Sequence, residues 1–180
     1  MLIKFIKYFV AFTTFIMGCM GVFYNREVIS EVTGFKYNEN GYKELKIEYI
    51  ASLTIPKISF SRVLYELNDK RNDLEENIIF VSGSSMPDEE KGNVIIAGHN
   101  GNSNISYFKD LNKLDLKDTF TIKYNNIEYN YKIVKKYLVK KNGTVEINRD
   151  IRFSTVTLIT CYGKDKQLVI IANLEQKKII

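Results

Sequence analysis

The stretches Val94-Ile95-Ile96-Ala97-Gly98-His99 and Thr157-Leu158-Ile159-Thr160-Cys161 decide how this chain is interpreted, because each is an apolar run of β type that ends on a reactive side chain. Outside the N-terminal segment, His99 and Cys161 are the only histidine and the only cysteine. A thiol with an imidazole partner is sufficient for acyl transfer through a thioester. We therefore expect the catalytic site at this pair. A lone cysteine at a strand end is otherwise usually a small core residue, and a lone histidine a satisfied polar group.

The N-terminal segment has the composition of a membrane span. Residues 8–25 carry no charge and are mostly apolar or aromatic, and Lys4 and Lys7 precede them. The length suits one crossing of a bilayer, and two lysines on a short tail favour a cytoplasmic N-terminus. We therefore expect a single-pass anchor in the cell membrane over residues 1–25, with the catalytic domain extracellular. The alternatives are a cleaved signal peptide and a lipoprotein signal that ends at Cys19.

The remaining chain is long enough for one domain. Residues 26–50 are polar and mixed in charge, which predicts a stalk or linker, and residues 51–180 are left for the catalytic domain. The formal net charge of +5 falls to +2 without the three basic residues that flank the apolar segment, so no nucleic-acid partner is indicated. Four lysines cluster at 135, 136, 140 and 141. We interpret them as the solvated face and end of a strand, with a site for a polyanionic wall or lipid headgroups as the alternative.

Runs of β type dominate from residue 51 onward. The predicted strands cover 51–55, 58–64, 78–82, 93–98, 118–124, 127–139, 154–161 and 167–174. Asn125-Asn126, between two of these runs, is typical of a tight hairpin turn. Two short helices are expected at 66–76 and 105–114, the second from apolar residues at positions i, i+3 and i+6. This pattern predicts an all-β fold, an eight-stranded closed or nearly closed β-barrel with two short helices, preceded by the N-terminal transmembrane helix.

These features together resemble the sortase family, the membrane-anchored cysteine transpeptidases of Gram-positive bacteria. The resemblance covers about residues 51–175. It is carried by Leu53-Thr54-Ile55-Pro56-Lys57-Ile58, Gly83-Ser84-Ser85-Met86-Pro87, Gly92-Asn93-Val94-Ile95-Ile96-Ala97-Gly98-His99-Asn100, Phe108 with Leu111, and Thr157-Leu158-Ile159-Thr160-Cys161. The specific feature is a strand that ends in cysteine 62 residues beyond a strand that ends in histidine. Either motif alone would be a weak signal.

The resemblance implies a β-barrel enzyme whose Cys161 attacks the Thr–Gly bond of an LPxTG-like sorting signal and passes the acyl group to a cell-wall amine. His99 would protonate the leaving amine and then deprotonate the incoming one. The implied partners are surface proteins with a C-terminal sorting signal and a peptidoglycan precursor or other amine acceptor; no cofactor or metal is implied. Four residues match positions that bind the sorting signal in the family, although such strand residues are core more often than not: Ala97, Thr157, Ile159 and Thr160.

One position departs from the family pattern. In sortases an arginine begins the strand after the cysteine and is thought to hold the substrate and its oxyanion, whereas this chain has Gln167 there. An amide can donate a hydrogen bond but has no charge, a difference on the order of 1–3 kcal/mol, or about ten- to a hundredfold in rate. Three interpretations remain open: catalysis with Gln167, a substitute cation, or a weak or inactive member. The candidate cations are Lys166, which would need a β-bulge to reach Cys161, and Arg149 and Arg152.

The class of sortase is predicted from what the sequence lacks. The segment between residues 141 and 154 is too short for the helical insertion of class B, and no Asp-Pro-aromatic lid of class C precedes residue 51. A class A, D or E type is therefore expected.

The alternative function is a catalytically silent sortase-like module that binds sorting signals. The acidic run at residues 88–90 lies where some sortases bind calcium, although a solvated turn is the expected interpretation.

Overall fold

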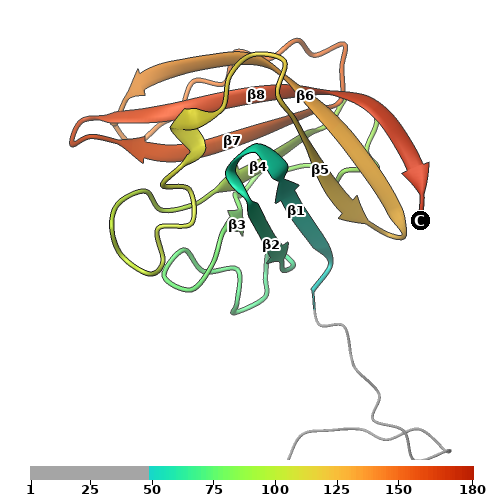
Figure 1. The fold of residues 1–180 in the computed structure, drawn as a ribbon, viewed down its shortest axis with the longest axis horizontal. Helices are drawn as coiled ribbons and strands as arrows, with labels where there is room; N and C mark the ends of the chain where they lie inside the picture. Colours follow the sequence, from blue (N-terminus) through green and yellow to red (C-terminus); the bar gives the residue numbers. More distant parts are fainter. Residues whose placement is uncertain (1–48) are drawn as a thin grey trace, which may run out of the picture. The chain divides into compact units, whose positions relative to one another are not determined.

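Residues 49–180, which the computed structural model describes, contain eight β-strands in one strongly curved sheet (Figure 1). The strands are β1 (Ala51–Ile55), β2 (Phe60–Leu64), β3 (Ile79–Phe80), β4 (Asn93–Ala97), β5 (Thr119–Tyr124), β6 (Ile127–Lys140), β7 (Thr155–Tyr162) and β8 (Lys166–Ile179). Their order is β2-β1-β5-β6-β8-β7-β4-β3. All pairs are antiparallel except β4 and β7, which are parallel. This arrangement confirms the predicted all-β, eight-stranded and nearly closed barrel.

The hairpin between β5 and β6 forms where the sequence predicts it. Asn125 and Asn126 both have positive φ angles, 50° and 59°, as the favoured two-residue hairpin turn requires. The turn fixes the register so that Phe120 lies opposite Tyr131. The two rings stack in the core with their centroids 5.7 Å apart. The alternation predicted for residues 127–133 therefore describes the first half of β6 correctly.

A β-bulge divides β6 into two halves. The register against β8 shifts between Ile133 and Lys135, and Val134, which has no partner in the ladder, is 40% exposed. Before the bulge, Ile133 lies opposite Ala172 in the core. Beyond it, Val139 lies opposite Gln167. An extra residue reverses which positions of a strand face the core, so the odd-numbered residues after Val134 face outward.

The strands β7 and β8 have one core face and one outer face. Their core-facing residues are Val156, Leu158, Leu168, Ile170 and Ala172. Because side chains alternate along a strand, the residues between them belong to the opposite face. We call this the outer face; it consists of Thr157, Ile159, Cys161, Gln167, Val169 and Ile171. Most of these side chains are nevertheless buried, which means that other parts of the chain cover the outer face.

The two predicted helices are wrong. Residues 66–76 form successive turns, because Asp69 and Asp73 accept hydrogen bonds from backbone amides two residues further on, which compete with a helix. Within 105–114 only the 3-10 helix η2 (Leu111–Lys113) forms. The apolar residues of segment 105–114 recur every three positions. This period fits the three residues per turn of a 3-10 helix better than the 3.6 of an α-helix.

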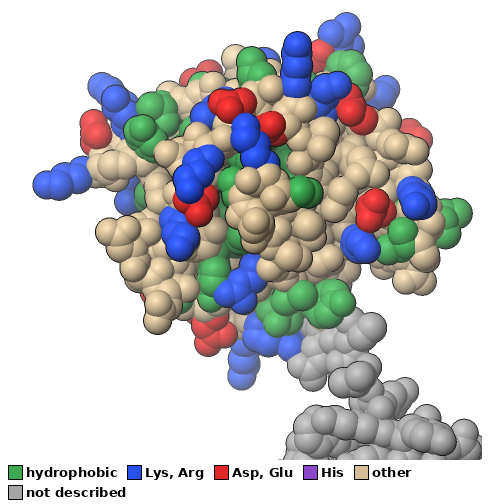
Figure 2. All heavy atoms as spheres, viewed as in Figure 1, with side chains coloured by type: hydrophobic (Ala, Val, Ile, Leu, Met, Phe, Trp, Pro, Cys, Tyr) green, Lys and Arg blue, Asp and Glu red, His purple; other side chains and the backbone are tan. Residues whose placement is uncertain are grey.

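The predicted anchor at residues 1–25 and the predicted linker, apart from its last two residues, lie outside the described part of the chain. Between residues 49 and 180, no helix is long and apolar enough to span a membrane. Basic and acidic side chains alternate over the face of the domain shown in Figure 2, and they form no continuous basic surface there.

Candidate active site where strands β4 and β7 end

The parallel pairing of β4 with β7 brings His99 and Cys161 to the same end of the sheet. Each residue of β4 from Asn93 to Ala97 pairs with the residue 62 positions further on, from Thr155 to Ile159. The same separation relates His99 to Cys161, two residues beyond the last pair. Neighbouring strands are about 4.8 Å apart, so the spacing noted in the sequence is the register of the ladder itself.

Hydrogen bonds continue this pairing beyond the end of β4. The amide of Gly98 donates to the carbonyl of Ile159 at 3.2 Å, and the hydroxyl of Thr160 donates to the carbonyl of Gly98 at 2.7 Å. The side-chain amide of Asn100 donates to the carbonyl of Cys161 at 2.7 Å. The backbones that carry histidine and cysteine are thus joined on both sides of the pair.

Gly98 allows a close approach that a larger residue would prevent. A Cβ added there would lie 2.8 Å from the ring of Phe108, which is fully buried. The amide of Phe108 donates to the carbonyl of His99 at 2.9 Å. The segment after β4 therefore packs directly over the end of β4. This packing positions His99 at the start of the loop that follows the strand.

Both candidate catalytic side chains are accessible. The side chain of His99 is 33% exposed, and Cys161 is a free, half-buried cysteine at the rim of the sheet. His99 Nε2 lies 3.2 Å from Glu75 Oε1, and the side chain of Glu75 is 73% exposed. Glu75 was not predicted as a site residue. It belongs to the segment 66–76, whose assignment as a helix gave no indication that its turns would bring a carboxylate to the imidazole.

Gln167 lies directly opposite Cys161 in the antiparallel ladder of β7 and β8. Opposite residues of such a pair have their side chains on the same face, with Cβ atoms about 5 Å apart. Gln167 is half-buried, and its amide makes no hydrogen bond within residues 49–180. The amide is therefore available to a substrate bound at the sulfur.

None of the cations considered from the sequence contacts Cys161. Lys166 is exposed and pairs with Tyr162, so it lies on the face away from the sulfur. Arg149 donates to the carbonyls of Lys91 and Phe153. Arg152 donates to both oxygens of Asp150, an interaction that raises the pKa of the guanidinium. The two arginines are thus engaged elsewhere, and Lys166 faces away from the sulfur.

A different lysine contacts the sulfur. Lys141 Nζ lies 3.6 Å from Cys161 Sγ, within the range of a hydrogen bond to sulfur. Lys141 follows β6 directly, and its backbone amide donates to the carbonyl of Asp165 at 2.8 Å. It stands two residues after Val139, which pairs with Gln167, and so it lies on the same face as Gln167 and Cys161. Before the structure, only the cluster of lysines at 135, 136, 140 and 141 pointed to this region.

The four predicted substrate-binding residues separate into two groups. Ala97 and Ile159 pair with each other on the face that carries Cys161, half-buried and 7% exposed respectively. Thr157 is on the same face but fully buried, and its hydroxyl donates to Asn93 Oδ1 at 2.9 Å. Thr160 is on the core face, 3% exposed, with its hydroxyl bound to Gly98. Ala97 and Ile159 therefore share the face of the sulfur, whereas the hydroxyls of the buried Thr157 and Thr160 are engaged within the sheet.

The segment from residue 141 to residue 154 covers the outer face. Lys135, on the outward side of β6, donates to the backbone carbonyl and the side-chain oxygen of Asn148. The hydroxyl of Tyr137 donates to the carbonyl of Glu146 and accepts from the amide of Asn148, and burial raises the pKa of this tyrosine. These bonds hold residues 146–148 against the outward side of β6, and Lys141 at the start of the segment contacts Cys161.

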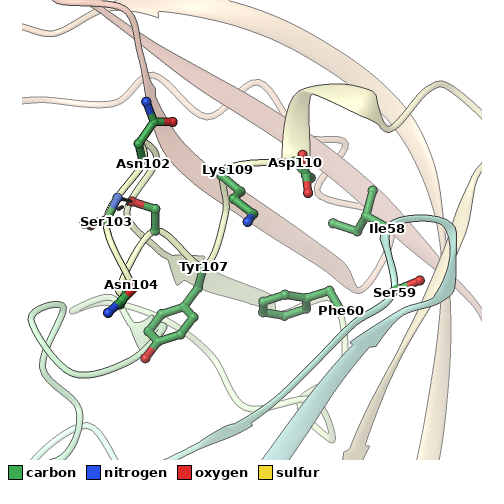
Figure 3. A pocket seen from close by; sticks show the side chains of 10 residues that line it. Ile58, Ser59, Phe60, Asn102, Ser103, Asn104, Tyr107, Lys109 and Asp110 are labelled. Atoms are coloured by element: carbon green, nitrogen blue, oxygen red, sulfur yellow. Dashed lines mark hydrogen bonds between the residues drawn. The ribbon is translucent and has the colours of Figure 1, made fainter.

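A hollow of about 380 Å³ lies along the loop that follows His99, apart from the reactive pair. Its lining includes Phe60, Tyr107 and Lys109, and Figure 3 shows the Tyr107 ring directed towards Asn104. It contains no cysteine or histidine, so the reactive pair lies outside it.

Among residues 49–180, no three or more histidine, cysteine or acidic side chains are grouped as a metal site would require. In the acidic run at 88–90, Glu89 Oε1 accepts the backbone amide of Met86 at 2.6 Å.

Known proteins with similar sequences and structures agree on one family. Residues 53–175 match the family model of the sortase domain. Sortase D from Bacillus subtilis (strain 168) is 30% identical over 110 residues, which cover 61% of this chain and 52% of that protein. The chain thus matches about half the length of this curated relative.

Two solved structures extend the comparison. Sortase C-1 from Actinomyces oris has a TM-score of 0.63 and 28% identity, and the match covers 74% of this chain and 76% of that one. The Clostridium perfringens Sortase D5 transpeptidase has a TM-score of 0.61 and 28% identity, with coverage of 71% and 79%. Because a sortase C is among these neighbours, the class A, D or E assignment stays a prediction. The family is nevertheless clear from the match over most of the described residues: the chain belongs to the sortase family.

Proposed function

We propose that this chain is a cysteine transpeptidase that cleaves an LPxTG-like sorting signal and transfers the released protein to a cell-wall amine. The observation that carries the proposal is the register of β4 and β7, which brings the only thiol and the only imidazole of residues 49–180 to adjacent strand ends in a chain of the sortase family. Both side chains are accessible at the rim, as a reaction with a peptide requires.

The proposed reaction has two steps. The sulfur of Cys161 attacks the carbonyl carbon of the Thr–Gly bond; the C–S bond forms, the C–N bond breaks, and His99 gives a proton to the leaving amine. An incoming amine then attacks the thioester, His99 takes its proton, and the sulfur leaves. Glu75, 3.2 Å from His99 Nε2, orients the ring for both transfers. The side-chain amide of Gln167 donates a hydrogen bond to the oxyanion that forms in each step.

We further propose that the uncharged segment at residues 8–25 anchors the protein in the cell membrane of a Gram-positive bacterium, with the domain extracellular. The support is the composition of that segment and the two lysines before it. Surface proteins with a sorting signal would then meet the enzyme at the membrane. Protease treatment of intact cells that express the full chain should degrade the domain, and a domain protected until the cells are lysed would contradict this orientation.

The central experiment uses the full chain in mild detergent with a panel of LPxTG-type peptides and an amine such as triglycine. We expect cleavage at one bond, identified by mass, a ligated product with the amine, and loss of both in Cys161→Ala. The neutral Gln167 favours a second candidate, a module that binds sorting signals without cleaving them. Peptide binding without cleavage or labelling of Cys161 would support that candidate and overturn the first.

A further inference from the structure

We propose that Lys141 is a catalytic residue that supplies the positive charge at Cys161 which Gln167 lacks. This inference rests on the proposed transpeptidase function and adds a component to it. Its central observation is the distance of 3.6 Å from Lys141 Nζ to Cys161 Sγ. An ammonium at that distance attracts the negative charge of a thiolate, which is the nucleophilic form of the sulfur.

The structure leaves this ammonium free for that role. Within residues 49–180, no carboxylate lies within ion-pairing distance of Lys141, and Cys161 is the contact of its side chain. Other lysines of the cluster are engaged: Lys135 donates to Asn148, and Lys136 donates to the carbonyls of Asn112 and Leu114. Lys141 therefore differs from its neighbours in what it contacts.

The fold gives a specific reason why Lys141 reaches the sulfur. The bulge at Val134 turns the odd-numbered residues of the second half of β6 to the outer face, so that Val139, Gln167 and Cys161 form one row across three strands. Lys141 lies two residues beyond Val139 on the same face, close to this row. Bulges beside functional sites commonly redirect a side chain in this way. Without the extra residue, the same lysine would point to the core side.

The charge and the amide have complementary roles. Lys141 stabilises the thiolate before attack, and when the sulfur is bonded to the carbonyl carbon, the flexible lysine follows the negative charge to the adjacent oxyanion. Gln167 donates a neutral hydrogen bond to the same oxygen from the opposite strand. Lys141 remains an ammonium throughout and transfers no proton, so the proton balance between His99 and the two amines is unchanged.

The test compares Lys141→Met with Lys140→Met in the full chain. Lys140 is a neighbouring exposed lysine on the other face of β6, paired with Lys166, and serves as the matched control. Alkylation of Cys161 at pH 7 by iodoacetate and by iodoacetamide is followed on the Cys161 peptide by mass, which separates it from Cys19. We expect Lys141→Met to slow both reactions about tenfold or more, and the anionic reagent most, because the ammonium also attracts it. Lys140→Met should change either rate less than twofold.

Two further variants make the result specific to charge. Lys141→Arg should keep most of the alkylation rate, and Gln167→Arg should restore what Lys141→Met removes, because position 167 lies directly opposite Cys161. High salt should reduce the difference between the wild type and Lys141→Met, as expected for an exposed charge. Unfolding midpoints of all variants show whether the fold is retained; Lys141→Gln replaces any Lys141→Met protein that does not fold.

The outcomes separate this inference from the proposed function. Peptide cleavage with equal alkylation rates in Lys141→Met and Lys140→Met would overturn the role of Lys141 and leave the transpeptidase intact. A charge-dependent alkylation rate without cleavage of any peptide would support the Lys141–sulfur interaction and overturn the substrate assignment. Parallel losses in alkylation and in kcat/KM for Lys141→Met, with recovery by Gln167→Arg, would support both.

Discussion

The two sides of Cys161 are built by different strand pairings. On one side, β4 and β7 run parallel, and every paired residue of β7 lies 62 positions after its partner in the sequence. His99 and Cys161, just beyond the last pair, have the same sequence separation. On the other side, β6 pairs with β8 across the bulge at Val134, and this bulge turns Lys141 towards the sulfur. In a regular ladder, a constant separation in the sequence predicts which residues lie at the same end of two strands, whereas a bulge breaks that relation.

The largest effect is expected on the regular side of Cys161, where β4 pairs with β7. His99→Ala should lower kcat/KM for peptide cleavage by about 10²–10⁴-fold, since general acid–base catalysis contributes that much. The fold should be unchanged because the side chain is at the rim, 33% exposed. Stopped assays with the LPxTG-type peptide that the wild type cleaves measure the loss. Cleavage within tenfold of the wild type would show that the pairing of strand ends does not make His99 the acid and base.

The irregular side should show smaller effects. Gln167→Ala should lower kcat/KM about three- to tenfold, because the loss of a neutral hydrogen bond to the oxyanion is worth about 1 kcal/mol. Lys166→Ala is the matched control, since this residue precedes Gln167 in β8 but faces away from the sulfur. An unchanged rate in Gln167→Ala would mean that the amide does not act on the oxyanion and that the charge of Lys141 acts without it.

Sequence patterns predict most of this fold because strands and turns depend on local chemistry. The hairpin at Asn125-Asn126 and the alternation over 127–133 were predicted from residue type alone, and both are present. The segment 66–76 failed because hydrogen bonds from its aspartate side chains compete with helix formation, and a periodicity argument does not weigh such bonds. That failure also concealed Glu75, which the turns place beside His99.

The candidate site divides in the same way. The positions of His99, Cys161 and Gln167 follow from motifs at strand ends, and the ladders place them as neighbours. Lys141 was assigned to a solvated strand end, because no residue type marks Val134 as a bulge. The direction of a side chain seven residues beyond an insertion depends on the tertiary pairing with β8, and no local pattern encodes it.

A weaker test of the regular side concerns Asn100, whose amide donates to the carbonyl of Cys161 at 2.7 Å. Asn100→Ala should lower the free energy of unfolding by about 1 kcal/mol and reduce turnover several-fold, because the strand end that carries the nucleophile loses a bond. Asn102→Ala, two residues further along the same loop and exposed, is the control and should change neither. Urea unfolding and peptide cleavage measure the two effects. Equal behaviour of the two variants would mean that the pairing beyond β4 does not depend on this bond.

The smallest effect should appear in the segment that follows Lys141, through the pH dependence of Asp150. Hydrogen bonds from the guanidinium and the backbone amide of Arg152 lower the pKa of Asp150 to about 2. A carboxyl whose pKa is lower in the folded state contributes stability above its ordinary value near 4, and this contribution disappears as the pH falls towards 2. Asp150→Asn should therefore unfold at a slightly lower temperature than the wild type at pH 6, and the two midpoints should converge near pH 2. Proteolysis between residues 141 and 154 should increase over the same range while β4 and β7 stay protected. A midpoint difference that persists at pH 2 would show that the Asp150–Arg152 bond does not control the segment. The attachment of the segment to β6 would then depend on Lys135 and Tyr137 instead.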